Sequence, residues 1–113
     1  MSSVLYHKNQ WNWGTGVTIV IARGLALCTV SVTNDDCSVA YLSGVMVHPS
    51  VRKRGYGRLL LKYSERRARL LGCTKIVLAT DPKQWISDWY RRNGFFDAGT
   101  REDGMIYLEK SLA

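Results

Sequence analysis

The stretch from Val45 to Leu61, VMVHPSVRKRGYGRLLL, constrains the fold of this chain more than any other. Apolar residues with two β-branched valines end at Pro49, a basic loop with two glycines follows, and a strongly helical segment comes next. Glycines let a backbone turn tightly and approach a ligand closely, while free amides at a helix start and nearby cationic side chains favour an anion. The stretch therefore predicts a strand, a phosphate-binding loop and a helix N-terminus.

The length and composition predict one globular domain. The chain has 113 residues, of which 46% are hydrophobic and 22% are charged, so residues 1–113 should form a single domain with one modest core. No apolar run approaches the roughly 20 residues of a membrane span, and residues 1–16 lack a signal-peptide pattern. We therefore expect a soluble, cytoplasmic protein with no membrane partner. Two histidines and three cysteines without a C-x-x-C spacing predict no metal site.

The positive charge is concentrated in one loop and one helix. The net charge is +7, and residues 52–69 hold eight basic side chains against the single acid Glu65. The basic and acidic residues outside this segment cancel. Such a concentration indicates either nucleic acid or a polyanionic cofactor as the partner. No aromatic stacking platform is interleaved with these charges, so the cofactor is favoured over nucleic acid.

The residue pattern predicts a mixed α/β (α+β) sheet that begins with an antiparallel meander. Because a helix separates the strand at 38–47 from the strand at 75–80, these two strands should be parallel. Trp85 and Trp89, four residues apart, should share one apolar helix face. The expected elements are strands at 4–7, 17–22, 25–33 and 38–47 with a turn at 34–36, a helix at 58–71, a strand at 75–80, a helix at 85–93, a strand or turn from Phe95, a polar loop at 97–104 and a strand at 105–112.

Two common nucleotide-binding motifs are absent, and a third pattern fits. A Walker-type loop needs G-x-x-x-x-G-K-[ST], and a dinucleotide fingerprint needs a third glycine where this chain has Leu60. The R-x-x-G-x-G pattern at Arg52, Gly55 and Gly57 instead resembles the acetyl-coenzyme A pyrophosphate loop of the GNAT acetyltransferase superfamily. The segment WYRRNGF at 89–95 is similar to the family's aromatic-Tyr-x-x-x-Gly-Phe segment. The resemblance covers residues 17–112 and implies the GNAT-like acyl-CoA N-acyltransferase fold.

The resemblance implies acetyl-CoA as the cosubstrate and assigns its parts to residues. The backbone amides from Arg54 to Arg58 would hold the pyrophosphate, assisted by Arg52 and the helix dipole. The strand end at 45–47 would pair with the pantetheine amides as a pseudo-strand, splayed from residues 76–79. The expected cofactor-binding residues are Val45, Met46, Val47, Arg52, Lys53, Arg54, Gly55, Tyr56, Gly57 and Arg58.

The resemblance also implies a catalytic acid and leaves several routes for the base. Tyr90 matches the family tyrosine that donates a proton to the departing thiolate. Tyr41 occupies the position where many family members carry Glu or His, and Ser43 lies on the same face, yet neither is a base near neutral pH. The alternatives are Asp81, a water chain held by Tyr41 and Ser43, or an amine that arrives neutral. An aspartate before proline is more often a turn or cap residue.

The front of the chain departs from the family pattern. Family members usually carry two helices between the first and second strands, and residues 1–16 cannot contain them. The acceptor side should therefore be open, or be completed by a second subunit or by Trp11 and Trp13. The resemblance implies acetyl transfer to a primary amine, such as a protein lysine, a chain terminus or a small amine, by direct attack in a ternary complex. The alternative is a weak or inactive GNAT-fold module that binds CoA or a macromolecular partner.

Overall fold

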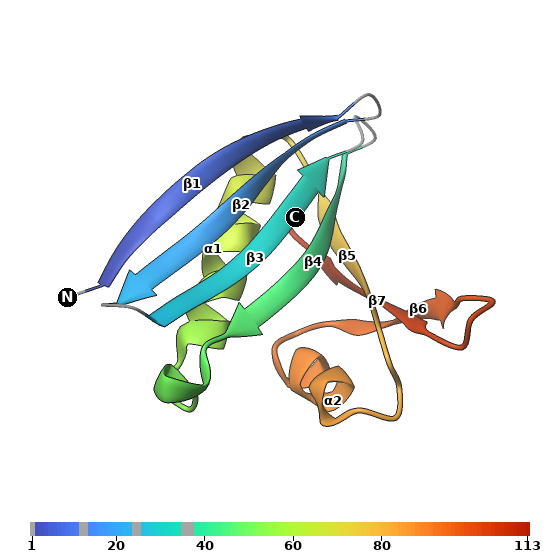
Figure 1. Cartoon of the computed structure of the whole chain (residues 1–113). Helices are drawn as coiled ribbons and strands as arrows, with labels where there is room; N and C mark the ends of the chain where they lie inside the picture. Colours follow the sequence, from blue (N-terminus) through green and yellow to red (C-terminus); the bar gives the residue numbers. More distant parts are fainter. Residues whose placement is uncertain (1, 12–13, 24–25, 35–37) are drawn as a thin grey trace.

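The computed structural model forms one mixed sheet with two α-helices (Figure 1). It describes residues 2–11, 14–23, 26–34 and 38–113. The strands are β1 (Ser2–Trp11), β2 (Gly14–Arg23), β3 (Ala26–Asn34), β4 (Val39–Val47), β5 (Lys75–Thr80), β6 (Phe96–Thr100) and β7 (Ile106–Ser111). The helices are α1 (Tyr56–Leu70) and α2 (Trp85–Arg92), and a 3-10 turn at Pro49–Val51 leads into α1.

The strand order is β1-β2-β3-β4-β5-β7-β6. β1 to β4 form the predicted antiparallel meander, and β4 pairs with β5 in parallel, as the intervening helix requires. The expected mixed α/β fold is therefore confirmed. Residues 12–13 alone separate β1 from β2, so two helices cannot lie between these strands. Trp13 and most of the turn expected at 34–36 fall outside the described residues.

Tertiary contacts move several element boundaries from the places that local patterns indicate. The strand expected at 4–7 is too short, because β1 pairs with β2 from Ser2 to Trp11. The polar loop expected at 97–104 is wrong in its first part, because Asp97 to Thr100 belong to β6, whose pairing with β7 outweighs low strand propensity. The helix expected from residue 58 begins at Tyr56, which is buried in the core.

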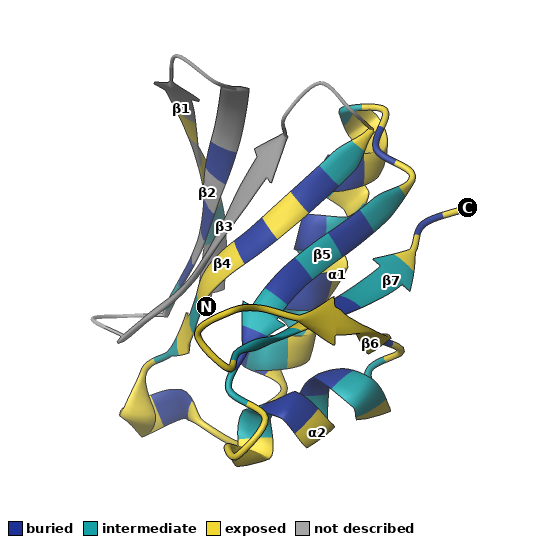
Figure 2. Ribbon diagram, turned by 90° about the vertical axis from the view of Figure 1, so that its right-hand side faces the viewer, coloured by how far each residue is buried: buried dark blue, intermediate teal, exposed yellow. Residues whose placement is uncertain are grey.

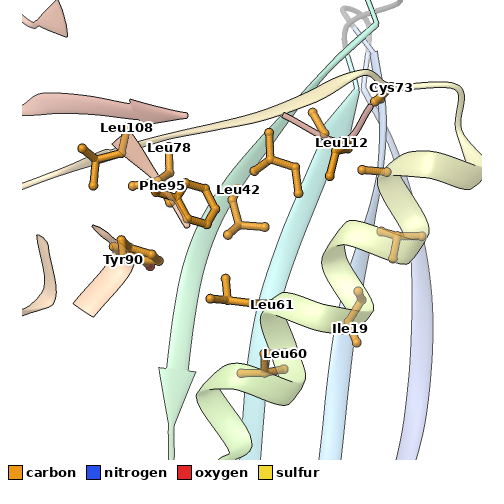
Figure 3. Packing of buried hydrophobic residues seen from close by; sticks show 14 of the residues in the cluster. Ile19, Leu42, Leu60, Leu61, Cys73, Leu78, Tyr90, Phe95, Leu108 and Leu112 are labelled. Atoms are coloured by element: carbon orange, nitrogen blue, oxygen red, sulfur yellow. The ribbon is translucent and has the colours of Figure 1, made fainter. Parts of the chain in front are cut away.

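Both helices pack on one face of the sheet. Leu60 and Leu61 of α1 and Tyr90 of α2 belong to the same buried cluster as Ile19 of β2 and Leu108 of β7 (Figure 3). β4 alternates between residues that are buried on this face and residues that are exposed on the other (Figure 2). Across the described residues, neither helix has both the length and the apolar character that a membrane crossing needs. The opposite face of the sheet carries no helix in the described part of the chain.

Lys110 of β7 links the sheet to both helices. Its Nζ lies 2.9 Å from Oε1 of Glu65 on α1 and donates a hydrogen bond of 3.1 Å to the carbonyl oxygen of Asn93, which follows α2. The Lys110 and Glu65 side chains are 28% and 17% exposed, so water replaces neither partner well. This contact fixes the C-terminal end of α2 against α1.

We expect Lys110→Met to lower the free energy of unfolding by about 1–3 kcal/mol, because Glu65 and the Asn93 carbonyl both lose their partner. Methionine keeps the unbranched stem. Lys75→Met is a matched control, since the pair of Lys75 with Glu109 is longer, at 3.4 Å, and more exposed; it should cost less than about 1 kcal/mol. Urea denaturation measures both variants, and equal losses would show that Lys110 has no special role.

Candidate active site

β4 and β5 part where β4 approaches the basic loop. Their pairing runs from Val39↔Lys75 to Tyr41↔Val77 and ends there, and the strands diverge beyond that point (Figure 1). The positive φ of Gly44, 64°, and a register shift in the pairing of β3 with β4 lie in the diverging half. The backbone of residues 45–47 thus forms an edge that β5 does not cover, and such an edge can accept an extended ligand with amide groups as an added strand.

The loop between β4 and α1 has the backbone pattern of an anion-binding nest. Lys53 and Gly55 have positive φ values of 63° and 84°, whereas Arg54 between them does not. Alternation of this kind turns successive backbone N–H groups toward one point, where they bind an anion. A lysine in this region of φ is uncommon and costs conformational energy. The surrounding structure therefore holds the loop in a shape that its own residues do not prefer.

The N-terminus of α1 follows the nest directly. Gly55 is the N-cap and provides no side-chain cap, and the first helical bond runs from the Leu59 N–H to the Gly55 carbonyl oxygen at 3.1 Å. Amides of a first helical turn lack acceptors within the helix, and the helix dipole adds positive potential there. The first turn contains no acidic residue. Four exposed cationic side chains surround this end: Arg52, Lys53, Arg54 and Arg58.

The two glycines of the motif have different structural reasons. Gly55 takes a left-handed backbone, and a Cβ built there would meet nothing within 4 Å. Gly57 lies in the first turn of α1, where a Cβ would come within 3.0 Å of Cζ2 of Trp89. The expectation that both glycines belong to the loop is therefore wrong for Gly57, because the helix begins at Tyr56.

Other expected cofactor-binding residues shape the turn or face solvent. Nε of Arg52 donates a hydrogen bond of 3.2 Å to the Val47 carbonyl oxygen and so closes the loop. Nδ1 of His48 accepts from the Ser50 N–H at 3.1 Å and caps the 3-10 turn. Among the ten expected residues, Tyr56 alone is buried, so its ring belongs to the core and only its backbone lies at the loop.

Tyr90 of α2 has a buried ring that lies between two other aromatic side chains. Its ring centroid is 5.2 Å from that of Trp89 and 5.6 Å from that of Phe95, edge to face in both cases. Its side chain is 6% exposed, and this burial raises the pKa of Tyr90 to about 12. The phenol therefore stays protonated at neutral pH, where it can donate a proton but cannot act as a base.

The raised pKa of Tyr90 predicts a loss of stability at alkaline pH. An unfolded chain releases this proton near pH 10, whereas the folded protein holds it until about pH 12. Between these values the folded state binds more protons, so the free energy of unfolding should fall as the pH rises from 10 toward 12, and Tyr90 should have no such effect below pH 10. Denaturant unfolding at pH 8, 9.5 and 11 should show a smaller alkaline loss for Tyr90→Phe. Identical pH dependence in both proteins would disprove the assignment.

The residues considered for the base lie at separate places. Tyr41 and Ser43 are exposed on the face of β4 that α1 does not cover. Asp81 follows β5, and its Oδ1 accepts a hydrogen bond from the Lys83 N–H at 2.9 Å. This bond gives Asp81 a turn-forming role and engages one of its carboxylate oxygens. The described residues contain no cluster of three metal-ligating side chains.

The sequence pattern predicts the surroundings of Trp89 only partly. Trp85 and Trp89 were expected to share one apolar face, yet Trp85 is 70% exposed, whereas Trp89 is half-buried beside Gly57. The spacing of the two residues does not distinguish them. They differ because the first turn of α1 lies against Trp89. The positive φ of Lys53 likewise has no signal in the sequence, since lysine is not a residue that favours this conformation.

The strand order and the strand–nest–helix unit define the chain as an acyl-CoA N-acyltransferase fold. Residues 15–96 match the Acetyltransferase (GNAT) domain family, and the chain belongs to this family. It is 30% identical over 96 residues to the amino-acid acetyltransferase of Vibrio vulnificus (strain CMCP6), which covers 84% of this chain and 20% of that protein. The chain thus spans about a fifth of the length of the curated relatives it matches.

Solved structures share the same architecture. The PaiA N-acetyltransferase of Thermoplasma acidophilum, in complex with coenzyme A, has a TM-score of 0.76 at 17% identity, covering 85% of this chain and 60% of that chain. The ribosomal-protein-S18-alanine N-acetyltransferase of Escherichia coli has a TM-score of 0.70 at 16% identity, covering 92% and 72%. The expected GNAT membership and fold are confirmed.

Proposed function

We propose that the chain is an acetyl-CoA-dependent N-acetyltransferase that acts on a primary amine by direct attack in a ternary complex. The observation that carries this proposal is the nest at residues 53–55, which leads into the first turn of α1 where β4 leaves β5. Converging N–H donors suit a pyrophosphate, and the uncovered strand edge suits a long arm with amide groups. Membership of the GNAT family and the CoA-bound T. acidophilum relative support the same conclusion.

The residues of the site fit acetyl-CoA. The amides from Arg54 to Arg58 would hold the pyrophosphate with Arg52 beside them, and residues 45–47 would align the pantetheine arm. When bound, acetyl-CoA supplies the acetyl group as a thioester with a thiolate leaving group. As the amine nitrogen bonds to the acetyl carbon and the C–S bond breaks, Tyr90 would give its phenolic proton to the sulfur. The phenol is protonated at neutral pH, so this proton is present when the sulfur leaves, and a proton from solvent then restores the phenol.

The proton of the attacking amine needs a separate route. Tyr41 and Ser43 are exposed on the same face of β4 and would hold a water chain that carries this proton to solvent. Asp81 is the second candidate, although its bond to the Lys83 N–H already uses one oxygen. The turnover of Asp81→Asn separates the two, because asparagine keeps the oxygen that accepts the Lys83 N–H and lowers kcat only if the carboxylate is the base.

The acceptor is proposed to be an amine that approaches the sheet face without helices. The relatives' names specify an amino acid in one case and the alanine of a ribosomal protein in the other. Since residues 12–13 alone join β1 to β2, no helix between these strands limits the size of an acceptor at this face. Light scattering measures whether the chain forms a dimer, as a second copy over this face would require.

Incubation with acetyl-CoA and a panel of amines tests the proposal. The panel contains free amino acids, a lysine peptide and a peptide with an N-terminal alanine, and free thiol release is measured alongside the mass of each acceptor. We expect thiol release that depends on one acceptor class and matches its acetylation. Saturable binding without transfer would favour a CoA-binding module, the alternative that the missing Glu or His on β4 supports. Absence of binding would reject both.

A further inference from the structure

Gly57 is a glycine for reasons of space. It lies inside the first turn of α1 without a positive φ, and a helical backbone prefers alanine to glycine by about 1 kcal/mol. A Cβ at this position would lie 3.0 Å from Cζ2 and 3.3 Å from Cη2 of Trp89, and 3.9 Å from Cγ2 of Val47. The missing side chain is thus replaced by the outer edge of the Trp89 indole.

The same indole contacts the proposed acid. The centroids of Trp89 and Tyr90 are 5.2 Å apart with the ring planes at 67°, and Tyr90 meets Phe95 at 5.6 Å with the same angle. Edge-to-face pairs in this range attract each other. A series of three rings therefore extends from the first turn of α1 to the residue before β6.

α2 depends on such contacts for its position. It has eight residues and no side-chain cap at Gln84, and helices of this length are unstable on their own. Its C-terminal end is held through the Asn93 carbonyl and Lys110, whereas its contact with the phosphate-binding end of α1 is made by Trp89. Movement of this indole would therefore shift Tyr90 relative to the loop.

We propose that Trp89 is a positioning residue that fixes Tyr90 relative to the pyrophosphate loop through its contact with Gly57. The proposal rests on the proposed function, because only acetyl transfer requires a fixed distance between Tyr90 and the pyrophosphate loop. A ligand whose pyrophosphate is held by the nest places its thioester at a fixed distance from the loop. The proton donor must lie within hydrogen-bond distance of the thioester sulfur. Because the Trp89 indole contacts the first turn of α1, this contact sets the distance between Tyr90 and the loop.

The proposal distinguishes two explanations of Gly57. If Gly57 exists so that a ligand can approach, a methyl group there should weaken CoA binding whatever residue stands at 89. If Gly57 exists to admit the indole, the methyl group should become harmless once the indole is smaller. Phenylalanine at position 89 lacks the benzo edge that contains Cζ2 and Cη2, so Trp89→Phe provides this space.

A double-mutant cycle of Gly57→Ala and Trp89→Phe tests the proposal. We expect Gly57→Ala to lower kcat by about tenfold or more while the Kd for CoA, from calorimetry, changes less than about threefold. The double variant should recover kcat to within about threefold of Trp89→Phe alone. Trp85→Phe is the matched control and should leave kcat, Kd and stability unchanged, because Trp85 is 70% exposed on the same helix. Circular dichroism confirms that all variants are folded during the assay.

Two results would overturn the proposal. One is a double variant no better than Gly57→Ala, which would assign Gly57 to the ligand. The other is loss of stability with kcat unchanged in every folded variant, which would leave Trp89 a packing residue only. If the wild type binds CoA but acetylates no amine, the proposed function fails instead. The Gly57–Trp89 contact is then still judged by the non-additivity of the free energies of unfolding of the two single variants and the double variant.

Discussion

Gly55→Glu should raise the Kd for acetyl-CoA by at least about 10²-fold and leave the chain folded. The substitution places a carboxylate beside the nest at residues 53–55, where it repels the pyrophosphate and accepts the N–H groups that would bind it. A Cβ at Gly55 meets no atom within 4 Å, so no steric clash accompanies the change. The left-handed φ of 84° costs about 1–2 kcal/mol, which a negative charge at the helix N-terminus partly offsets. Isothermal titration calorimetry measures the loss.

Gly72→Glu provides the matched control. Gly72 has a φ of 83° and nothing within 4 Å of its built Cβ, so it carries the same strain and charge at the opposite end of α1. Its Kd should stay within about twofold of the wild type, because its charge lies more than a screening length away. Gly55→Ala adds the strain without the charge and should weaken binding less than tenfold. If Gly55→Glu and the wild type bind acetyl-CoA with equal affinity, this loop does not bind the pyrophosphate.

The elements that the sequence predicts well are those whose side chains interact with near neighbours. The helical spacing in α1 and the alternation in β5 come from such local patterns, and both elements lie close to their expected ranges. β6 contains Asp97 and Gly99, which local propensity disfavours in a strand, and it forms because β7 pairs with it. Nonlocal pairing is not visible in a short window of sequence.

The sequence predicts which residues form the candidate site but not how they are arranged. The motif at Arg52, Gly55 and Gly57 predicts an anion-binding loop, because few residue types satisfy a tight turn beside an anion. The left-handed Lys53 and the contact between Gly57 and Trp89 depend on how the loop and α2 meet, which residue types alone do not determine. The residue motif alone therefore does not reveal that a Cβ at its second glycine would meet Trp89.

The charged residues of segment 52–69 have two kinds of surroundings: some contact the rest of the fold, and others stay exposed at the loop. Glu65, the one acid of segment 52–69, pairs with Lys110, so this carboxylate stabilises β7 contacts. The guanidinium of Arg67 lies 6.0 Å from the ring centroid of Tyr6 on β1, in the range of a cation–π contact. Composition revealed the concentration of charge, whereas only the structure shows that Arg67 faces the sheet and that Arg52, Arg54 and Arg58 remain exposed at the helix start.

Tyr90→Phe should lower kcat by about 10²-fold, with the KM for acetyl-CoA within about threefold of the wild type. Phenylalanine keeps the ring contacts with Trp89 and Phe95, so the variant removes the proton donor and little else. The departing thiolate then takes its proton from water, which is not held in place. Stopped-flow or steady-state thiol release with the acceptor found in the amine panel gives both constants.

The control and the pH profile separate proton donation from packing. Tyr63→Phe removes a hydroxyl from α1 and keeps a ring that packs against the core, so its kcat should remain within about twofold of the wild type. Because burial raises the pKa of Tyr90 to about 12, the wild-type rate should show no loss from phenol ionisation between pH 8 and pH 10. A limb that falls near pH 10 in the wild type and disappears in Tyr90→Phe would mean that the phenol is hydrated in the working enzyme. Equal rates in the wild type and Tyr90→Phe would leave Tyr90 as one ring of the aromatic series, and the departing thiolate would need another donor.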